Sequence, residues 1–413
     1  MFSDDAERRH CPEIESCLGT QVLSDCESGG GRSVTEDSGV CIVIPHYNRV
    51  RLLAETLDSI GRQSVQPAEV IIVDDHSDPS VQNELQQFLS GKVRILLQQP
   101  GLSGPSAARN TGWRASSCSL IMFVDSDDLL APFCLEERIR SIQKSADSDF
   151  WVFPVGVFLE RIGDRRTLWN NLCGDHDLER FLRSDPVWHT SGPIWKKCAL
   201  ERIGGFNEQV SYGDDSDLSI RALLAGLLFQ KFPLVAPDTF VRRSDHNRIT
   251  NDQTDRALDA RRTRLYAGSD AVKDATPVQK RLWAGQYFVE CEYLLFRVSD
   301  SLPRQMEIWR QHWIRHRPGI VTQVLVAVYL QLSNRLKETA YLVLRILRRL
   351  LMLVLDPAYF PSGAGIESTE MSEAQWARLA ASIAEAGESL PQVQPQQIII
   401  QDLQDGDVRG NEL

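Results

Sequence analysis

An unbroken apolar run that ends in a cluster of carboxylates constrains this chain more than any other stretch. Residues 120–124 read LIMFV and lead directly into Asp125, Asp127 and Asp128. A short apolar run bounded by turn residues predicts a buried central strand. Ligands of open α/β sheets bind at the carboxyl ends of such strands, and mutually repelling acids there favour a divalent cation. The alternative is a solvated acidic turn that caps the following helix.

The composition is that of a globular protein whose charge is unevenly spread. The chain has 413 residues, which is long enough for one large domain with appendages, and its net charge is −11. No nucleic-acid partner is expected, because phosphate binding requires a basic face. The nine cysteines are scattered, show no CxxC zinc pattern and follow no signal peptide. This pattern predicts a cytoplasmic protein, because the cytosol keeps thiols reduced. No apolar run reaches the roughly 18 residues of a membrane span.

Short apolar runs alternate with amphipathic stretches through the first part of the chain. The expected strands cover residues 40–45, 69–73, 92–97 and 120–124. The expected helices cover residues 52–63, 81–89, 107–116 and 133–144. This alternation predicts an α/β fold with a doubly wound, mostly parallel central sheet and helices on both faces.

After residue 149 the rhythm changes. Residues 150–160 are strand-like. Residues 188–195, which read WHTSGPIW, are expected to form a loop of aromatic and small residues. The domain organisation that follows has four parts. They are a disordered acidic leader at 1–39, an α/β domain at 40–255, a helical extension at 256–361, and an acidic, disordered tail at 362–413 with one short helix at 372–386.

Five motifs follow one another between residues 40 and 250. They read IPHYN from Ile44, EVIIVDDHS from Glu69, AARNTG from Ala107, FVDSDD from Phe123, and IGGFNE from Ile203 followed by GDDSDL. In this order and spacing they resemble the family 2 glycosyltransferases of the GT-A fold. The resemblance implies inverting, metal-dependent transfer of a sugar, a hexose in particular. The donor would be a nucleotide-diphospho-sugar, with a UDP-sugar favoured, and the acceptor a hydroxyl of a glycan or lipid-linked molecule.

The resemblance also implies how the donor is held. Pro45 and Tyr47 would form a wall against the base, and Asp75 would accept a hydrogen bond from an imide N–H such as uracil N3. Of the two aspartates at 74–75, one is expected to serve only the turn and the helix start. Asp125 would face the ribose and the metal. Arg109 could contact the pyrophosphate, or it could be a solvated helix arginine.

The metal position of the family falls on Asp127. A bound Mn²⁺ or Mg²⁺ there would bridge the two phosphates and stabilise charge on the leaving oxygen. Asp128 would then lie behind the ligands. His246, with basic neighbours in Arg242 and Arg243, is a further candidate metal or phosphate ligand, and a surface histidine is the alternative.

Asp215 is the candidate general base. Inversion requires a carboxylate that deprotonates the acceptor hydroxyl during attack. Asp214, Asp215 and Asp217 are crowded, which should raise at least one pKa; a helix start stabilised by the macrodipole is the alternative. The sequence departs from the family pattern at Asp214, where Glu is common, and at Ser216, where an aromatic residue is common. His76 likewise replaces a usual glycine.

Two other stretches have open interpretations. The loop with Trp188, His189 and Trp195 could stack on a sugar acceptor, or its aromatic residues could belong to the core. Residues 341–355 predict a basic amphipathic helix with Arg345, Arg348 and Arg349 on one face. Such a helix could bind the inner membrane surface, or it could complete the domain or a dimer interface.

Two other functions compete with sugar transfer. One is a metal-dependent phosphohydrolase, because some of these enzymes also place Asp-x-Asp after a strand. It offers no explanation for Tyr47, Asp75 or the acidic cluster at Asp215. The other is a non-catalytic scaffold that retains the fold and uses the basic helix.

Overall fold

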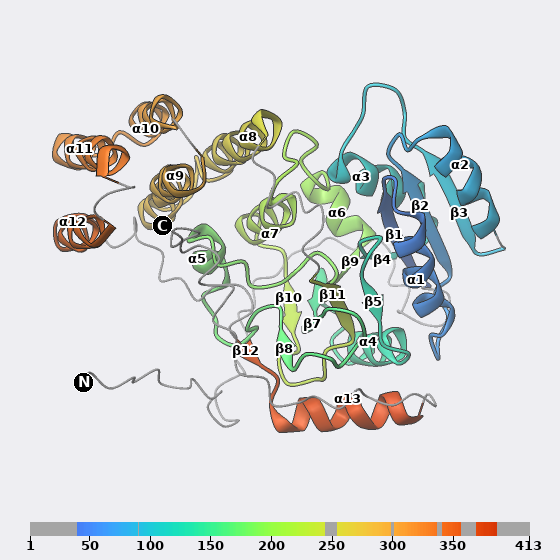
Figure 1. Cartoon of the computed structure of the whole chain (residues 1–413). Coiled ribbons are helices and arrows are strands. Elements are labelled where there is room, and N and C mark those ends of the chain that lie inside the picture. Colours follow the sequence, from blue (N-terminus) through green and yellow to red (C-terminus); the bar gives the residue numbers. More distant parts are fainter. Residues whose placement is uncertain are drawn as a thin grey trace, which may run out of the picture.

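The computed structural model describes residues 39–89, 91–243, 254–298, 301–336, 341–356 and 369–385. Its centre is a seven-stranded sheet with the order β10-β6-β9-β4-β1-β2-β3 (Figure 1). Every neighbouring pair is parallel except those that β9 makes with β4 and β6. The strands are β1 (Val40–His46), β2 (Glu69–Asp74), β3 (Val93–Leu97), β4 (Leu120–Phe123), β6 (Phe150–Val152), β9 (Pro193–Lys196) and β10 (Phe229–Lys231).

Helices cover both faces of this sheet, because successive strand residues point to opposite sides. Cys41 and Val43 of β1 belong to one core cluster, whereas Ile42 and Ile44 belong to another. The first cluster lies under α3 (Pro105–Ala115), α6 (Lys197–Ile203) and α7 (Asp214–Leu224). The second lies under α1 (Val50–Gly61), α2 (Pro79–Leu85, continued by the 3-10 turn Gln86–Phe88) and α4 (Cys134–Gln143). The predicted α/β architecture is confirmed.

A smaller five-stranded sheet was not predicted as a unit, although residues 238–242, a short strand candidate in the sequence, form one of its strands. Its order is β12-β8-β7-β11-β5, and it combines short strands from distant parts of the chain. The strands are β5 (Leu129–Leu130), β7 (Val155–Phe158), β8 (Thr167–Leu168), β11 (Thr239–Arg242) and β12 (Thr369–Glu370). Residues 150–160, expected as one strand, divide into β6 and β7 of different sheets. The expected loop at 188–195 runs into strand β9 instead.

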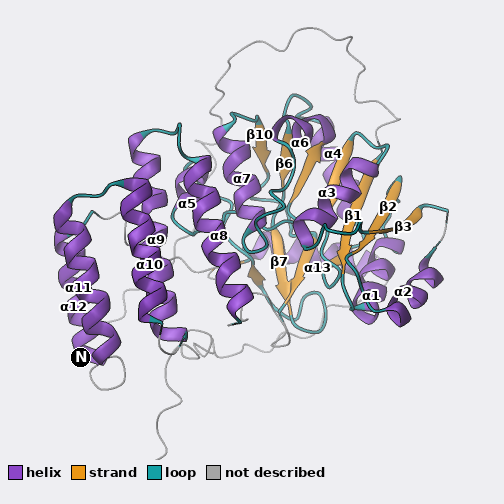
Figure 2. Cartoon of the chain, turned by 90° about the horizontal axis from the view of Figure 1, so that it is seen from above, coloured by secondary structure: helices purple, strands orange, loops and turns teal. Residues whose placement is uncertain are grey.

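The helical extension lies at one side of the sheet in both views (Figures 1 and 2). Trp283 and Tyr287 are fully buried and join the core cluster below α3 and α7. The helices are α8 (Asp255–Ala271), α9 (Pro277–Arg297), α10 (Leu302–His316), α11 (Ile320–Leu336) and α12 (Tyr341–Val354), with the short α5 (Asp177–Leu182) between them and the sheet.

The chain returns from this extension to the small sheet. Helix α13 (Glu373–Glu385), predicted at 372–386, buries Leu379 and Ile383 against Phe158 and Phe240. Gln375 Nε2 donates hydrogen bonds to the carbonyls of Pro233 and Val235, both 3.0 Å away. The C-terminal part therefore contains an ordered element that completes the second sheet.

Several expectations concern residues that lie outside the described ranges. They are the acidic leader, the tail beyond residue 385 and His246. Within the described ranges, none of the helices combines the length and apolar character that crossing a bilayer requires. Within the same ranges, Cys41, Cys118, Cys134, Cys198 and Cys291 carry free thiols.

Candidate active site

Three polar segments meet because strands β4, β1 and β2 are parallel neighbours. Their carboxyl ends bring the turn after His46, the Asp74–Asp75 pair and the turn that starts at Asp125 to one edge of the sheet. Helix α3 lies against this edge. A side chain at Gly112 would lie 2.3 Å from Val43, so the glycine lets α3 pack closely on β1.

Asp74 has a structural role. Its carboxylate is fully buried and lies 3.1 Å from His46 Nδ1. It also accepts hydrogen bonds from the Ser77 backbone and the Gln82 side chain. Burial would raise the pKa of Asp74, but the hydrogen bonds from His46 and Ser77 outweigh it and lower the pKa. The expectation that one of the two aspartates only serves the turn is confirmed for Asp74.

Asp75 offers a hydrogen-bond acceptor to a ligand. Its Oδ2 accepts from the Gly104 backbone N–H at 2.7 Å, and Gly104 has a φ of +92° that suits glycine. Its Oδ1 is buried and has no hydrogen-bond partner among the residues that the structure describes. An acceptor of this kind costs free energy unless a ligand donates to it. Nearby along the sheet edge, Tyr47 is 57% exposed and Pro45 is half-buried.

His76 occupies the position where the family usually has glycine. It adopts a φ of +62°, the left-handed conformation that glycine reaches without strain. Its Nε2 donates to the carbonyl of Leu102 at 2.8 Å. His76 therefore adopts a conformation that favours glycine and contacts the loop that carries Gly104.

Arg109 joins the turn after β4 to the start of α7. It is 4% exposed, and its two Nη atoms each lie 2.6 Å from a carboxylate, one of Asp125 and one of Asp214. Its guanidinium also lies over the ring of Phe206. The sequence offered a pyrophosphate contact or a solvated position for Arg109, whereas the side chain is buried between two acids.

Asp215 differs from the acids beside it. Arg109 pairs with Asp214, and Arg221 pairs with Asp217 at 2.8 Å. Asp215 has no ion pair among the described residues, and it lines a small cavity together with aromatic and apolar side chains. These are Phe123, Trp188, Trp195, Phe206 and Leu218. Burial and then the charge of Asp214 raise the pKa of Asp215 to about 6. The crowding that the sequence suggested contributes through Asp214, but burial is the larger cause.

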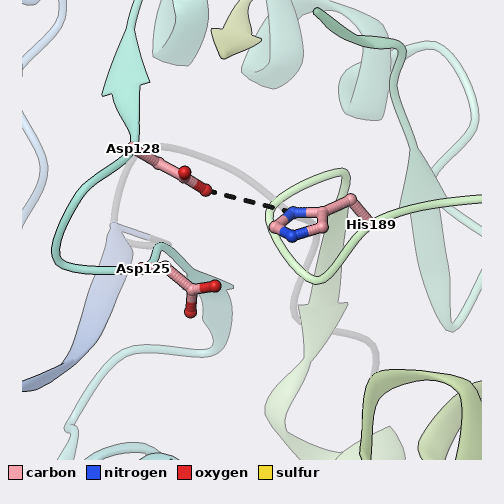
Figure 3. A group of neighbouring side chains, drawn as sticks. All are labelled: Asp125, Asp128 and His189. Carbon is pink, nitrogen blue, oxygen red and sulfur yellow. Dashed lines mark ion pairs between the residues drawn. The ribbon is translucent and has the colours of Figure 1, made fainter. Parts of the chain in front are cut away.

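Asp125, Asp128 and His189 form a group that could hold a cation. One ligand atom of each lies within 4.8 Å of the others, and Figure 3 shows the two aspartates on the turn after β4 facing His189 on another loop. Asp128 is buried, and burial together with the charges of Asp125 and Asp127 raises its pKa well above the usual range. A cation would relieve this repulsion. Two carboxylates and an imidazole fit Mn²⁺ better than Mg²⁺, because imidazole favours transition metals.

Asp127 lies outside this group of three. Its Oδ2 is 3.0 Å from Arg49 Nη1, and its carbonyl accepts from Arg242 Nε at 3.1 Å. Of the residues in the aromatic loop, Trp188 and Trp195 are 2% and 1% exposed and belong to the core, as one of the two alternatives proposed. His189 was expected only as part of a sugar-stacking loop, and no spacing in the sequence connects it with Asp128.

Comparisons of the sequence with known proteins agree with these observations. The family model described as glycosyl transferase family 2 matches residues 41–197. The uncharacterized glycosyltransferase YwdF of Bacillus subtilis is 31% identical over 183 residues, which are 44% of this chain and 67% of YwdF. The poly(ribitol-phosphate) beta-N-acetylglucosaminyltransferase TarP of Staphylococcus aureus is 31% identical over 122 residues, 29% of this chain and 37% of TarP.

Solved structures share the fold. A crystal structure of S. aureus TarS 1-349 in complex with UDP-GlcNAc matches with a TM-score of 0.53 at 15% identity, covering 72% of this chain and 88% of the other. A crystal structure of S. aureus TarS also gives a TM-score of 0.53, at 17% identity, over 73% of this chain and 55% of that one. These comparisons favour a glycosyltransferase over the phosphohydrolase and the scaffold. The chain belongs to glycosyl transferase family 2 and has its GT-A fold.

Proposed function

We propose that this glycosyltransferase moves a hexose from a UDP-sugar to a hydroxyl of a glycan or lipid-linked acceptor, with inversion and with a divalent cation. The observation that carries the proposal is the position of Arg109, which holds Asp125 and Asp214 2.6 Å from its two ends. It joins the donor side, at the carboxyl end of β4, to the start of α7, where Asp215 lies. We therefore assign donor and base to one site.

The uridine would bind beside Asp75. The unpartnered Oδ1 of Asp75 can accept the N3–H of uracil, and this pairing would satisfy a buried acceptor. Tyr47 exposes its ring at the same edge and can stack on the base, with Pro45 beside it. Asp125, with its side chain 29% exposed, can accept from the ribose hydroxyls while Arg109 holds its other side.

The residues at the turn after β4 would hold the cation. Asp125, Asp128 and His189 present their ligand atoms to one another, and the resemblance adds Asp127 as a ligand. His246 remains a predicted ligand outside the described residues. When bound, a divalent cation neutralises the diphosphate and stabilises charge on the leaving oxygen.

Asp215 would act as the general base. The acceptor oxygen forms its bond to C1 of the sugar as the bond from C1 to the diphosphate oxygen breaks, and UDP leaves with the electron pair. The hydroxyl proton passes to the carboxylate of Asp215. A pKa raised to about 6 makes this carboxylate a stronger base than a solvated aspartate, while it stays ionised at pH 7.

Donor and cation can be tested by thermal unfolding. UDP-GlcNAc is the first donor to test, because TarS binds it and TarP is named for transferring N-acetylglucosamine. At 100 times its dissociation constant, a bound donor should stabilise the fold by about 2.7 kcal/mol. The stabilisation should require Mn²⁺ and vanish with EDTA. Equal stabilisation by GDP-sugars would contradict the role of Asp75, and stabilisation that survives EDTA would contradict the cation.

His189 provides a sharper test of the metal site. Replacing His189 by Phe should weaken Mn²⁺ binding in calorimetry by about tenfold or more, since an imidazole ligand is lost. His176 is exposed and does not belong to the group that Asp125, Asp128 and His189 form, so His176→Phe should leave Mn²⁺ binding unchanged. An unaltered Mn²⁺ affinity in His189→Phe would exclude His189 as a ligand.

We also propose that α11 and α12 dock the enzyme on the inner surface of an anionic membrane, where a lipid-linked acceptor would be found. Helix α12 buries Leu344 and Leu351, and its Arg348 pairs with Glu292 of α9 at 2.8 Å. The two helices also expose large apolar side chains. These are Ile320, Val321, Val324, Val328, Leu332, Val343, Ile346, Leu350, Met352, Leu353 and Val354.

The charge of this region supports a lipid partner over a second copy of the chain. Residues 303–355 are basic within a chain of net charge −11. Arg335 of α11 and Arg349 of α12 are exposed, as is Arg317 just before α11. An amphipathic surface with cations beside its apolar face is typical of binding to anionic lipid headgroups.

Two charges placed on this apolar surface should abolish membrane binding. Ile346→Asp with Leu353→Asp, at positions 50% and 82% exposed, should reduce co-sedimentation with phosphatidylglycerol vesicles by about tenfold or more. Leu234 is 60% exposed outside the extension, so Leu234→Asp is the matched control. Unchanged lipid binding in the double variant would exclude the membrane as the partner of this surface. A wild-type dimer that the double variant dissociates would assign the surface to self-association.

A further inference from the structure

Arg49 lies in a fixed turn at the edge of the donor site. Its backbone N–H donates to His46 Nε2 at 3.2 Å, and His46 Nδ1 donates to the buried Asp74 at 3.1 Å. The main chain at Arg49 is therefore fixed by the last residues of β1 and β2. The side chain is different, because it is 37% exposed and extends to Asp127 at the rim.

The Arg49 guanidinium forms an ion pair with the carboxylate of Asp127, which the resemblance predicts to be a metal ligand. Arg49 Nη1 lies 3.0 Å from Asp127 Oδ2, and Asp127 is absent from the group that Asp125, Asp128 and His189 form. A guanidinium at this distance opposes a divalent cation, since like charges repel and it engages the same oxygen.

The turn itself need not move when the two charges exchange. Arg242, whose side chain is only 10% exposed, donates to the Asp127 carbonyl at 3.1 Å and pairs with Glu55 at 2.6 Å. The backbone of Asp127 is thus held from the side of β11. Rotation of the Arg49 and Asp127 side chains would break the ion pair and turn both groups to a ligand.

We propose that Arg49 is a diphosphate-binding residue that pairs with Asp127 while the donor is absent. On donor binding, Asp127 turns to the cation and the guanidinium turns to the phosphate oxygens, whose geometry its forked donors match. This inference rests on the proposed donor and cation. It explains why the carboxylate expected to bind metal is ion-paired with a side chain from another segment.

The substitution Arg49→Gln should change two binding constants in opposite directions. Without the competing guanidinium, calorimetry should show Mn²⁺ alone binding about threefold tighter or more. UDP binding at saturating Mn²⁺ should weaken about tenfold, because a charge-assisted hydrogen bond to the diphosphate is lost. Arg49→Lys should fall between the wild type and Arg49→Gln for UDP. Arg51 is exposed at the start of α1, two residues after Arg49, so Arg51→Gln should change neither constant.

The outcomes separate this inference from the function on which it rests. If Arg49→Gln leaves both affinities unchanged, or lowers both together, the proposed exchange of partners by Arg49 and Asp127 is refuted. The proposed donor and cation are unaffected by that result. If the wild type binds neither Mn²⁺ nor UDP, the proposed function itself fails. In an Asp127→Asn background, Arg49→Gln should no longer tighten Mn²⁺ binding. A gain that persists there would refute competition at Asp127.

Discussion

Replacing Asp215 by Asn should lower kcat for sugar transfer by about 10²–10⁴-fold, the range expected for loss of a general base. Binding of UDP with Mn²⁺ should be preserved, because the donor contacts proposed for Asp75 and Asp125 lie on other segments. Initial rates with UDP-GlcNAc and calorimetry with UDP measure the two effects separately. Asp175 is exposed on the surface, and Asp175→Asn should leave both unchanged.

The pH dependence gives the same prediction a second readout. The base must be ionised in the free enzyme, and the pKa of Asp215 is raised to about 6 by burial and by Asp214. As the pH falls through 6, the carboxylate takes up a proton and kcat/KM should fall about tenfold per pH unit. The residual activity of Asp215→Asn should lack this acidic limb. A variant with full kcat, or with the limb intact, would show that another group is the base.

The sheet was largely predictable because its central strands are buried on both faces. Such strands appear as continuous apolar runs, and β1, β2 and β4 match the runs at their positions. The second sheet was missed because its strands have only two to four residues, too few to show a period. A proline lies at each of the two places where the expected elements at 150–160 and 188–195 differ from the structure. Pro154 separates β6 from β7, and Pro193 opens β9, a position that proline tolerates.

The site was predictable where chemistry and strand position coincide. Asp75 and Asp125 follow strands, so their meeting at one edge follows from parallel pairing. The contacts of Arg109 were not predictable, because spacing does not tell which of several acids a helix arginine will meet. The same holds for His189, which reaches Asp128 only through the antiparallel insertion of β9 between β4 and β6. Long-range pairing of this kind is a property of packing.

Replacing Arg109 by Met should lower the free energy of unfolding by about 3 kcal/mol. Arg109 is 4% exposed and balances two carboxylates, and its loss leaves them close together without compensation. The lower end of the usual range applies because the Asp125 side chain is 29% exposed. Urea unfolding measures the change. Arg114, on the same helix with its side chain 52% exposed, is the matched control, and Arg114→Met should stay within about 0.5 kcal/mol of the wild type.

A second substitution identifies the cause of the loss. Adding Asp214→Asn to Arg109→Met removes one of the stranded charges, so the double variant should be more stable than the sum of the single effects by about 0.5–3 kcal/mol. The resemblance alone allowed a different role, a contact to the pyrophosphate. That role requires Arg109→Met to weaken UDP binding while the unfolding free energy stays unchanged. Such a result would mean that the two ion pairs at 2.6 Å do not hold the donor side and the base together.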